Sequence, residues 1–166
     1  TLLIKGVDKL AGVRFKIGID YIEVGTYAVA AAITGGKITL TNLDQTNLEP
    51  IILPFTDFGL EFERVGDSLT ITANKLKAVS ELITNIWPGF PTDLMSVAIV
   101  LATQSRGVTL CHDWMYESRM FFVEKLILMG GKITLANPHR VFVYGPSELR
   151  GREFATPDIR AGMALV

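Results

Sequence analysis

The sequence predicts an α/β fold built of repeated β-α-β-α-β-β units, with the helices in the core and the sheets outside. An order of apolar helix and alternating strands recurs after about 70 residues, and it starts a third time after about 65 more. The first helix of each unit is apolar nearly all the way round, which is typical of a buried helix. If these helices are buried together, the strands that follow them must lie outside.

The first unit is expected at about residues 13–75. Apolar alternation predicts the strands, and glycine pairs and proline mark the helix ends and distortions. The expected elements are strands Leu2–Ile4 and Val13–Ile17, a helix from Asp20 to Ile33 ending at Gly35-Gly36, strand Lys37–Thr41, a weaker helix Leu48–Phe58 distorted by Pro54, and strands Leu60–Arg64 and Ser68–Ala73 turning at Gly66-Asp67.

The second unit is expected at about residues 88–145, and a third begins at about 153–166, so that 1–166 forms part of one domain. The elements are helix Asp93–Thr103, strand Gly107–Cys111, helix Glu117–Met129 ending at Gly130-Gly131, strands Lys132–Leu135 and Arg140–Tyr144, and a helix from Asp158, with Pro157 suited to its first turn. Aligning Glu23, Asp93 and Asp158 matches Ile38–Leu40 with Val108–Leu110, Thr41 with Cys111, and Leu69–Ile71 with Val141–Val143.

Composition excludes several classes of protein. The chain has 166 residues, enough for a core, and its net charge of −1 with scattered Lys and Arg argues against nucleic acid. Although 49% of the residues are apolar, the apolar runs fall short of the roughly 20 residues of a membrane span. The single cysteine, Cys111, allows no internal disulfide, and we expect it to be a small packed side chain. One cysteine and no signal peptide predict a cytoplasmic protein. The first residue, Thr1, and the apolar end Met163–Val166 suggest a piece of a longer chain.

The stretch from Trp87 to Met95 forms a stiff turn before the second apolar helix. Pro88 and Pro91 fix φ at two points, and Gly89 allows freedom between them. Two interpretations of Asp93 are open. The residues alone favour a helix cap by Thr92 or Asp93, because both types are preferred at N-caps. The alternative is a carboxylate that a rigid loop presents to a ligand.

Several motifs, taken in order and spacing, resemble those of the enolpyruvyl transferase family over nearly the whole chain. They are Ile22-Glu23-Val24-Gly25-Thr26-Tyr27, Ala30–Gly36, Phe90-Pro91-Thr92-Asp93-Leu94, Tyr116-Glu117-Ser118-Arg119-Met120-Phe121, Gly145-Pro146-Ser147-Glu148-Leu149 and Asp158-Ile159-Arg160-Ala161-Gly162. The family fold has two domains, each an inside-out α/β barrel of three such units. The resemblance therefore implies that this chain is less than half of an enzyme and inactive alone.

The resemblance also implies a reaction. It is the transfer of the enolpyruvyl group of phosphoenolpyruvate to the 3-hydroxyl of UDP-N-acetylglucosamine, in peptidoglycan synthesis, without cofactor or metal. Asp93 corresponds to the family's candidate base for that hydroxyl, and the helix N-terminus would favour its ionised form but weaken it as a base. Met115 corresponds to a nucleotide contact through its backbone, and Asp158 and Arg160 to a motif beside the reacting centre. Two interpretations of Arg119 are open: it forms a structural ion pair, or it contacts a ligand.

The chain departs from the family pattern in several places. Ser118 stands where the family usually has Asn. The family's phosphoenolpyruvate-binding lysine and arginines, and its reactive cysteine, are not in this chain. His112 and His139 lack metal-ligand spacing and are expected at the surface. Trp87 could stack on a base or sugar, but it more often packs a loop against the core.

Alternative functions stay open at this stage. The sister reaction on shikimate 3-phosphate would use the same fold, and a non-catalytic binding or scaffold module could be built of the same unit. The expected partners are the two substrates and either the remainder of the enzyme or a second copy of the chain, through the apolar flank of the last helix or open sheet edges.

Overall fold

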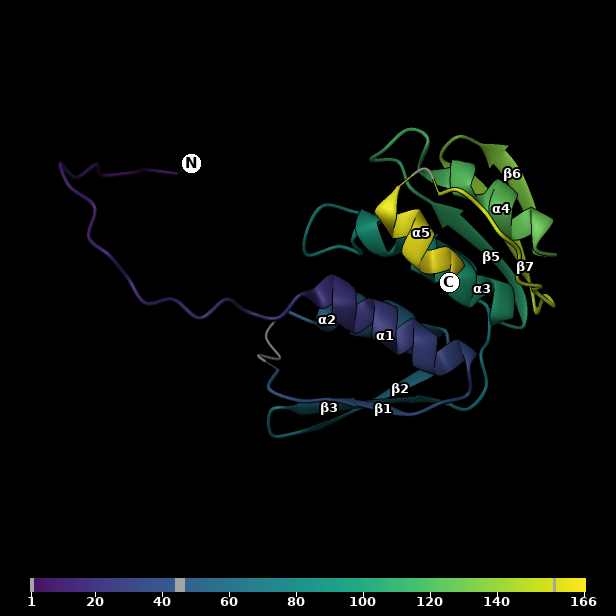
Figure 1. Ribbon diagram of the computed structural model, residues 1–166, viewed down its shortest axis with the longest axis horizontal. Helices are drawn as coiled ribbons and strands as arrows, with labels where there is room; N and C mark the ends of the chain where they lie inside the picture. The colour runs from purple at the N-terminus through teal and green to yellow at the C-terminus, as the bar shows by residue number, and fades with distance from the viewer. Residues whose placement is uncertain (1, 44–46, 157) are drawn as a thin grey trace.

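The computed structural model describes residues 2–43, 47–156 and 158–166. Two sheets flank a set of helices, so the predicted α/β class is confirmed (Figure 1). Helix α1 (Tyr21–Ile33) packs on the first sheet, and α3 (Met95–Gln104) packs on the second; α3 also contacts α1 and α5 (Ile159–Leu165). These helices therefore lie between the two sheets, as the apolar patterns predict.

The first sheet has three strands in the order β1-β3-β2, all antiparallel. The strands of this sheet and the helices around them follow the sequence pattern closely. In chain order they are α1, β1 (Ile38–Leu40), α2 (Glu49–Asp57, with Pro54 inside it), β2 (Leu60–Val65) and β3 (Ser68–Ala73). Asp20 caps α1 by accepting a hydrogen bond from the Ile22 amide at 2.8 Å, and Gly35, at φ +65°, lies in the turn after the helix.

The second sheet has four strands in the order β4-β5-β7-β6. Its elements are β4 (Glu81–Ile83), the 3₁₀ turn η1 (Thr92–Leu94), α3, β5 (Gly107–His112), η2 (Arg119–Phe122), α4 (Val123–Leu128), β6 (Lys132–Asn137) and β7 (Arg140–Gly145). The helix expected from Glu117 begins later, because Ser118 takes a left-handed conformation with φ +67°. The order β5-β7-β6 repeats the order β1-β3-β2, with β4 added in parallel at the β5 edge.

Register corrects one detail of the sequence alignment. Leu40 lies opposite Leu69 in the first sheet, and Cys111 lies opposite Val141 in the second. Cys111 is therefore the counterpart of Leu40 and not of Thr41. A shift of one residue exchanges the two faces of a strand, which is why Cys111 points into the core and is fully buried.

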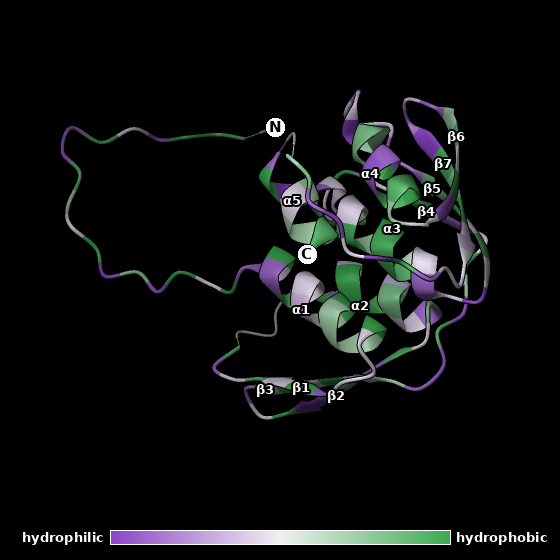
Figure 2. Ribbon diagram, turned by 45° about the vertical axis from the view of Figure 1, so that its right-hand side comes forward, coloured by the Kyte–Doolittle hydropathy of each residue, from purple (hydrophilic) through white to green (hydrophobic). Residues whose placement is uncertain are grey.

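The core between the sheets is formed by the inner faces of both sheets and by the helices. All residues of α3 from Met95 to Thr103 are buried, and the hydropathy colouring shows this helix as one of the most apolar parts of the molecule (Figure 2). Gly25 of α1 allows close approach, because a Cβ there would lie 2.5 Å from Leu94 Cδ1. The largest fully buried side chains are Phe55, Phe58, Leu48, Ile51, Leu60, Leu69, Ile71, Leu94, Met95, Ile99, Leu101 and Met120.

The N-terminal segment differs from the prediction. Leu2–Ile4 and Val13–Ile17 form no strand, and their apolar side chains are exposed in an extended segment that leaves the body of the molecule (Figure 1). Strand propensity needs a neighbouring strand and burial to become effective, and this segment has neither. Conversely, β4 is absent from the sequence prediction. Pro157 lies outside the described residues.

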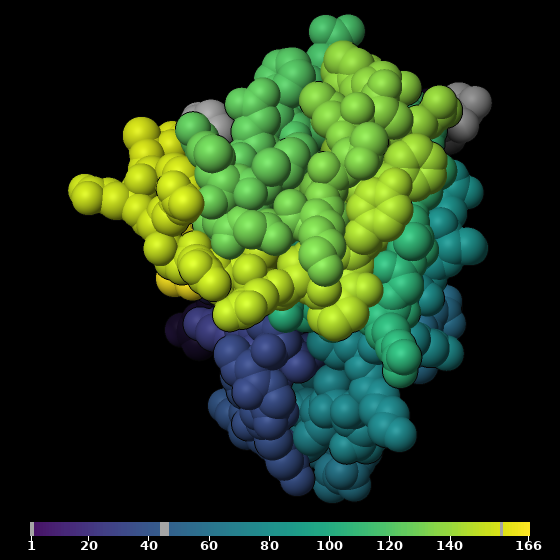
Figure 3. Space-filling model, turned by 90° about the vertical axis from the view of Figure 1, so that its right-hand side faces the viewer, coloured from purple at the N-terminus to yellow at the C-terminus, as the bar shows by residue number. Residues whose placement is uncertain are grey.

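The two halves of the chain form two stacked bodies (Figure 3). The first half, in purple to teal, lies below the second half, in green to yellow. The turn before α3 and the start of α5 belong to the second half and face the pocket described next.

Candidate functional site

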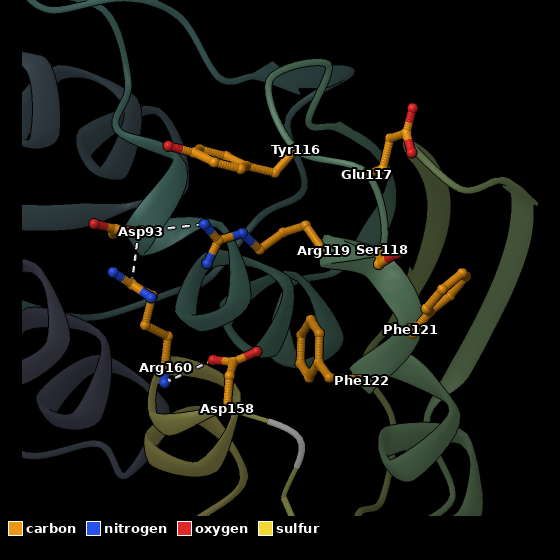
Figure 4. Close-up of a pocket in the computed structure, with 9 residues that line it drawn as sticks. All are labelled: Asp93, Tyr116, Glu117, Ser118, Arg119, Phe121, Phe122, Asp158 and Arg160. Atoms are coloured by element: carbon orange, nitrogen blue, oxygen red, sulfur yellow. Dashed lines mark hydrogen bonds and ion pairs between the residues drawn. The ribbon is translucent and has the colours of Figure 1, made fainter.

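A pocket of about 440 Å³ opens beside the N-terminal ends of α3 and α5 (Figure 4). It brings together four of the five residues that the sequence predicts for the site: Asp93, Arg119, Asp158 and Arg160. The remaining lining residues come from the loop after β5 and from η2: Tyr116, Glu117, Ser118, Phe121 and Phe122.

Asp93 is not a helix cap. It lies within η1, and neither η1 nor α3 has a capping hydrogen bond from a side chain. Its Oδ1 instead receives Arg160 Nε at 2.6 Å and Arg119 Nη2 at 3.3 Å. Within the described part of the chain, no hydrogen bond involves Oδ2, so the second oxygen of this partly exposed carboxylate is available to a ligand.

Arg160 reaches Asp93 from the first turn of α5. Asp158 caps this helix by accepting hydrogen bonds from the Arg160 and Ala161 amides at 2.8 and 2.9 Å. The cap therefore fixes the start of the helix from which the Arg160 side chain extends. The carboxylate of Asp158 has a structural role at the edge of the pocket, whatever else it contacts.

Arg119 forms a structural ion-pair network, which agrees with one of its two predicted readings. Its side chain is 10% exposed and bridges two carboxylates, with Nε 3.9 Å from Asp113 Oδ2 and Nη2 on Asp93. Its guanidinium also lies 5.1 Å from the centre of the Tyr116 ring. A guanidinium has five N–H donors, so Arg119 and Arg160 keep donors for an anionic ligand.

Sequence reasoning missed Asp113, the fully buried carboxylate behind the pocket. Its Oδ1 accepts hydrogen bonds from Thr84 Oγ1 and the Met115 amide, both at 3.0 Å, and its Oδ2 accepts one from Thr92 Oγ1. The sequence feature that could have indicated Asp113 is an acidic residue directly after the apolar strand β5. Its partners are scattered along the chain, so only the tertiary structure reveals the network.

Met115, the fifth predicted residue, lies outside the residues that line the pocket. Its amide N–H is already bonded to Asp113. Any backbone contact to a nucleotide would therefore use the carbonyl oxygen of Met115, and the neighbouring Tyr116 is the residue that faces the pocket.

The remaining titratable and aromatic candidates are accounted for by packing. Burial raises the pKa of the Cys111 thiol to about 12. Burial and the nearby Arg140 lower the pKa of His112. Both His112 and His139 are half-buried, and His139 Nδ1 lies 2.8 Å from the Asp113 carbonyl oxygen. Trp87 packs on Tyr21, with ring centres 4.9 Å apart. Among the described residues, no cluster of His, Cys, Asp and Glu could hold a metal ion.

None of the helices in the described ranges has the length and apolarity required to cross a bilayer.

Known proteins resemble this chain in both sequence and fold. UDP-N-acetylglucosamine 1-carboxyvinyltransferase of Treponema denticola is 43% identical over 173 residues, which is 99% of this chain and 41% of the relative. The protein of the same name from Borreliella burgdorferi is 42% identical over 174 residues, 100% of this chain and 41% of the relative. The chain thus spans about 41% of the length of these curated relatives.

Two solved structures share the fold. The enolpyruvyl transferase NikO from Streptomyces tendae matches with a TM-score of 0.78 at 22% identity, over 90% of this chain and 36% of that one. EPSP synthase from Acinetobacter baumannii matches with a TM-score of 0.64 at 15% identity, over 91% of this chain and 36% of that one. A sequence profile described as EPSP synthase (3-phosphoshikimate 1-carboxyvinyltransferase) matches residues 1–166. The chain therefore belongs to the EPSP synthase family, whose solved members in this comparison are enolpyruvyl transferases.

Proposed function

We propose that this chain is part of a transferase that moves the enolpyruvyl group of phosphoenolpyruvate to the 3-hydroxyl of UDP-N-acetylglucosamine, in peptidoglycan synthesis. One observation carries the proposal: Asp93 lines the pocket and is held between Arg119 and Arg160 through Oδ1, while Oδ2 makes no hydrogen bond to the described residues. Such a carboxylate can accept a hydrogen bond from a substrate hydroxyl.

Asp93 is proposed as the general base. It takes the proton of the 3-hydroxyl as that oxygen adds to the phosphate-bearing enol carbon, while the methylene carbon takes up a proton. Loss of a proton from that carbon and cleavage of the carbon–oxygen bond to phosphate then restore the double bond and release inorganic phosphate, and Asp93 returns its proton to phosphate or water. The two guanidinium groups fix the orientation of the carboxylate, and their remaining N–H groups suit the negative charge of the sugar nucleotide.

The choice of UDP-N-acetylglucosamine over shikimate 3-phosphate is supported by the relatives. Those with 40–43% identity over nearly the whole chain carry the UDP-N-acetylglucosamine name, whereas the EPSP synthase structure is 15% identical. Arg119, Asp158 and Arg160 are proposed as substrate-binding residues beside Asp93, and Met115 as a nucleotide contact through its carbonyl oxygen. A scaffold role without catalysis has no observation in its favour.

We further propose that the two sheets and the helices between them form part of an inside-out α/β barrel. Units at about 13–75 and 88–145 and the start of a third at about 153–166 would then be its segments. The opposite wall of the cleft, with the phosphoenolpyruvate contacts, would come from the remainder of a longer chain. In its absence, the exposed Ile159 and Met163 of α5 favour self-association of this chain. A cytoplasmic location is kept as a prediction.

The experiment is a titration of the ¹⁵N-labelled chain with UDP-N-acetylglucosamine, followed by protein-observed NMR. We expect saturable shifts at Asp93, Arg119 and Arg160, which Asp93→Asn weakens. The matched control is Asp57→Asn, which changes an exposed acid at the end of α2 and should leave the shifts as in the wild type.

Shikimate 3-phosphate serves as the competing ligand. Tighter binding of shikimate 3-phosphate would replace the proposed acceptor by the alternative one. A well-dispersed spectrum with no shifts at any concentration of UDP-N-acetylglucosamine would count against a preformed site in this chain.

A further inference from the structure

We propose that Asp113 is the positioning residue of the pocket: its buried carboxylate sets the placement of Asp93 and of the 115–119 loop. The inference rests on the function proposed above, because it concerns how the base of that reaction is held. Asp113 itself does not line the pocket, so it would act through its neighbours.

The first step of the argument is that the carboxylate is buried and fully used. Asp113 has no exposed surface. Thr84 and the Met115 amide donate to Oδ1, and Thr92 and Arg119 approach Oδ2. A buried charge is tolerated only when it is paired and hydrogen-bonded, and four donors meet that condition here.

The second step is that the donors lead to the pocket by two routes. Thr92 is the residue directly before Asp93 in η1, so its hydroxyl ties the turn that carries Asp93 to Asp113. Arg119 is the second route, because the same guanidinium faces Asp113 through Nε and Asp93 through Nη2. A single buried acid, Asp113, therefore positions the Asp93 carboxylate through both Thr92 and Arg119.

The third step is that the backbone of Asp113 is also fixed. Its amide donates to the His139 carbonyl oxygen at 2.9 Å, and its carbonyl oxygen lies 2.8 Å from His139 Nδ1. The turn between β6 and β7 therefore anchors the residue against the second sheet. Held at backbone and side chain, Asp113 provides a rigid reference for a pocket that is otherwise built from loops and helix ends.

The test uses Asp113→Asn in the full-length protein that carries this chain. The amide has nearly the same shape, but its NH₂ group cannot accept the hydrogen bonds that one carboxylate oxygen accepts now. We expect kcat to fall by about tenfold to a hundredfold, as expected for a misplaced catalytic group. The KM for phosphoenolpyruvate, whose proposed contacts lie elsewhere, should change little.

A spectroscopic readout separates positioning from general loss of stability. In protein labelled with ¹⁵N-arginine and ¹⁵N-methionine, three signals should shift and exchange faster in Asp113→Asn: the Nε–H of Arg119, the Nε–H of Arg160, which pairs with Asp93, and the amide of Met115. The signals of Arg64 and Met129, remote from the pocket, should keep their wild-type positions. A uniform change in all signals would indicate a purely structural role and overturn the inference.

Thr92→Val is the second variant, because it removes one donor and leaves the carboxylate in place should Asp113→Asn fail to fold. It should lower kcat in the same direction by a smaller factor. Thr39→Val is its matched control, since it also removes one threonine hydrogen bond, to Thr70 at 3.0 Å on the outer face of the first sheet, and should leave kcat unchanged.

Failure of the inference and failure of the proposed function give different results. An active wild type with unchanged kcat in Asp113→Asn and Thr92→Val would overturn the positioning role alone. A wild type inactive with UDP-N-acetylglucosamine would remove the proposed function, and the Arg119 and Met115 signals would then decide whether Asp113 holds these groups.

Discussion

Replacement of Arg119 by methionine should destabilise the protein far more than the same replacement at Arg64. Both arginines form ion pairs in this chain. Arg119 is 10% exposed and faces the fully buried Asp113, whereas Arg64 and Glu49 are 38% and 58% exposed at 3.2 Å. Methionine keeps much of the aliphatic stem in each case and removes the charge.

The magnitude follows from what each change leaves behind. Breaking a buried pair by removing one partner costs about 3–5 kcal/mol, because a buried charge stays without compensation. Asp113 keeps hydrogen bonds from Thr84, Thr92 and the Met115 amide, so we expect the lower end, about 3 kcal/mol. An exposed pair contributes up to about 1 kcal/mol. For a chain of this size, Arg119→Met should lower Tm by about 6–12 °C.

The assay is equilibrium unfolding in urea with both single variants and with Arg119→Met combined with Asp113→Asn. If a stranded Asp113 carboxylate causes the loss, the double variant should cost clearly less than the sum of the two single changes. Additive costs, or an Arg119→Met variant as stable as Arg64→Met, would refute the reasoning that Arg119 compensates the buried negative charge of Asp113.

Three further predictions concern packing and titration. Gly145→Ala should cost about 3 kcal/mol in urea unfolding, because a Cβ there would lie 2.1 Å from the Ser105 carbonyl oxygen, whereas Gly151→Ala meets nothing within 4 Å and should change stability by less than about 0.5 kcal/mol. Equal costs would contradict the packing argument. Cys111, with its pKa raised to about 12 by burial, should resist a thiol reagent at pH 8 in the native protein and react once urea unfolds the chain; fast labelling of the native protein would be inconsistent with the buried position. His112 should titrate below pH 6.5 by NMR, because burial lowers its pKa. The stability that the neutral imidazole contributes should therefore be present above pH 6.5 and decline as pH falls through the folded-state pKa. A titration midpoint above 6.5 would contradict the lowered pKa and reverse this dependence of stability on pH.

The sequence pattern predicts much of the fold because burial and periodicity coincide in it. Helices α1 and α3 are apolar nearly all round, and they lie between the sheets. The hairpin β2–β3 turns at Gly66, where the backbone is left-handed. The failures are equally physical. The segment Val13–Ile17 alternates as a strand should, but it has no strand beside it in this structure.

The candidate site was predicted only in part, because spacing along the chain does not show which charges meet. Family resemblance indicated Asp93, Arg119, Asp158 and Arg160, and the structure brings these four to one pocket. The residues alone favoured a helix cap at Asp93, but neither η1 nor α3 has a capping hydrogen bond from a side chain, and Asp93 pairs with two arginines instead. Asp113 could not be found, because its donors come from four separate positions between Thr84 and Arg119.

The most direct test of the central claim is phosphate release by the full-length protein that carries this chain, with Asp93→Asn beside the wild type. We expect the wild type to release phosphate from phosphoenolpyruvate only when UDP-N-acetylglucosamine is present. Asp93→Asn should reduce this rate by about 10²–10⁴-fold, the usual contribution of a general base, while still binding UDP-N-acetylglucosamine. A rate within about tenfold of the wild type, or release that depends on shikimate 3-phosphate instead, would contradict the assignment of Asp93 as the base that acts on the sugar nucleotide.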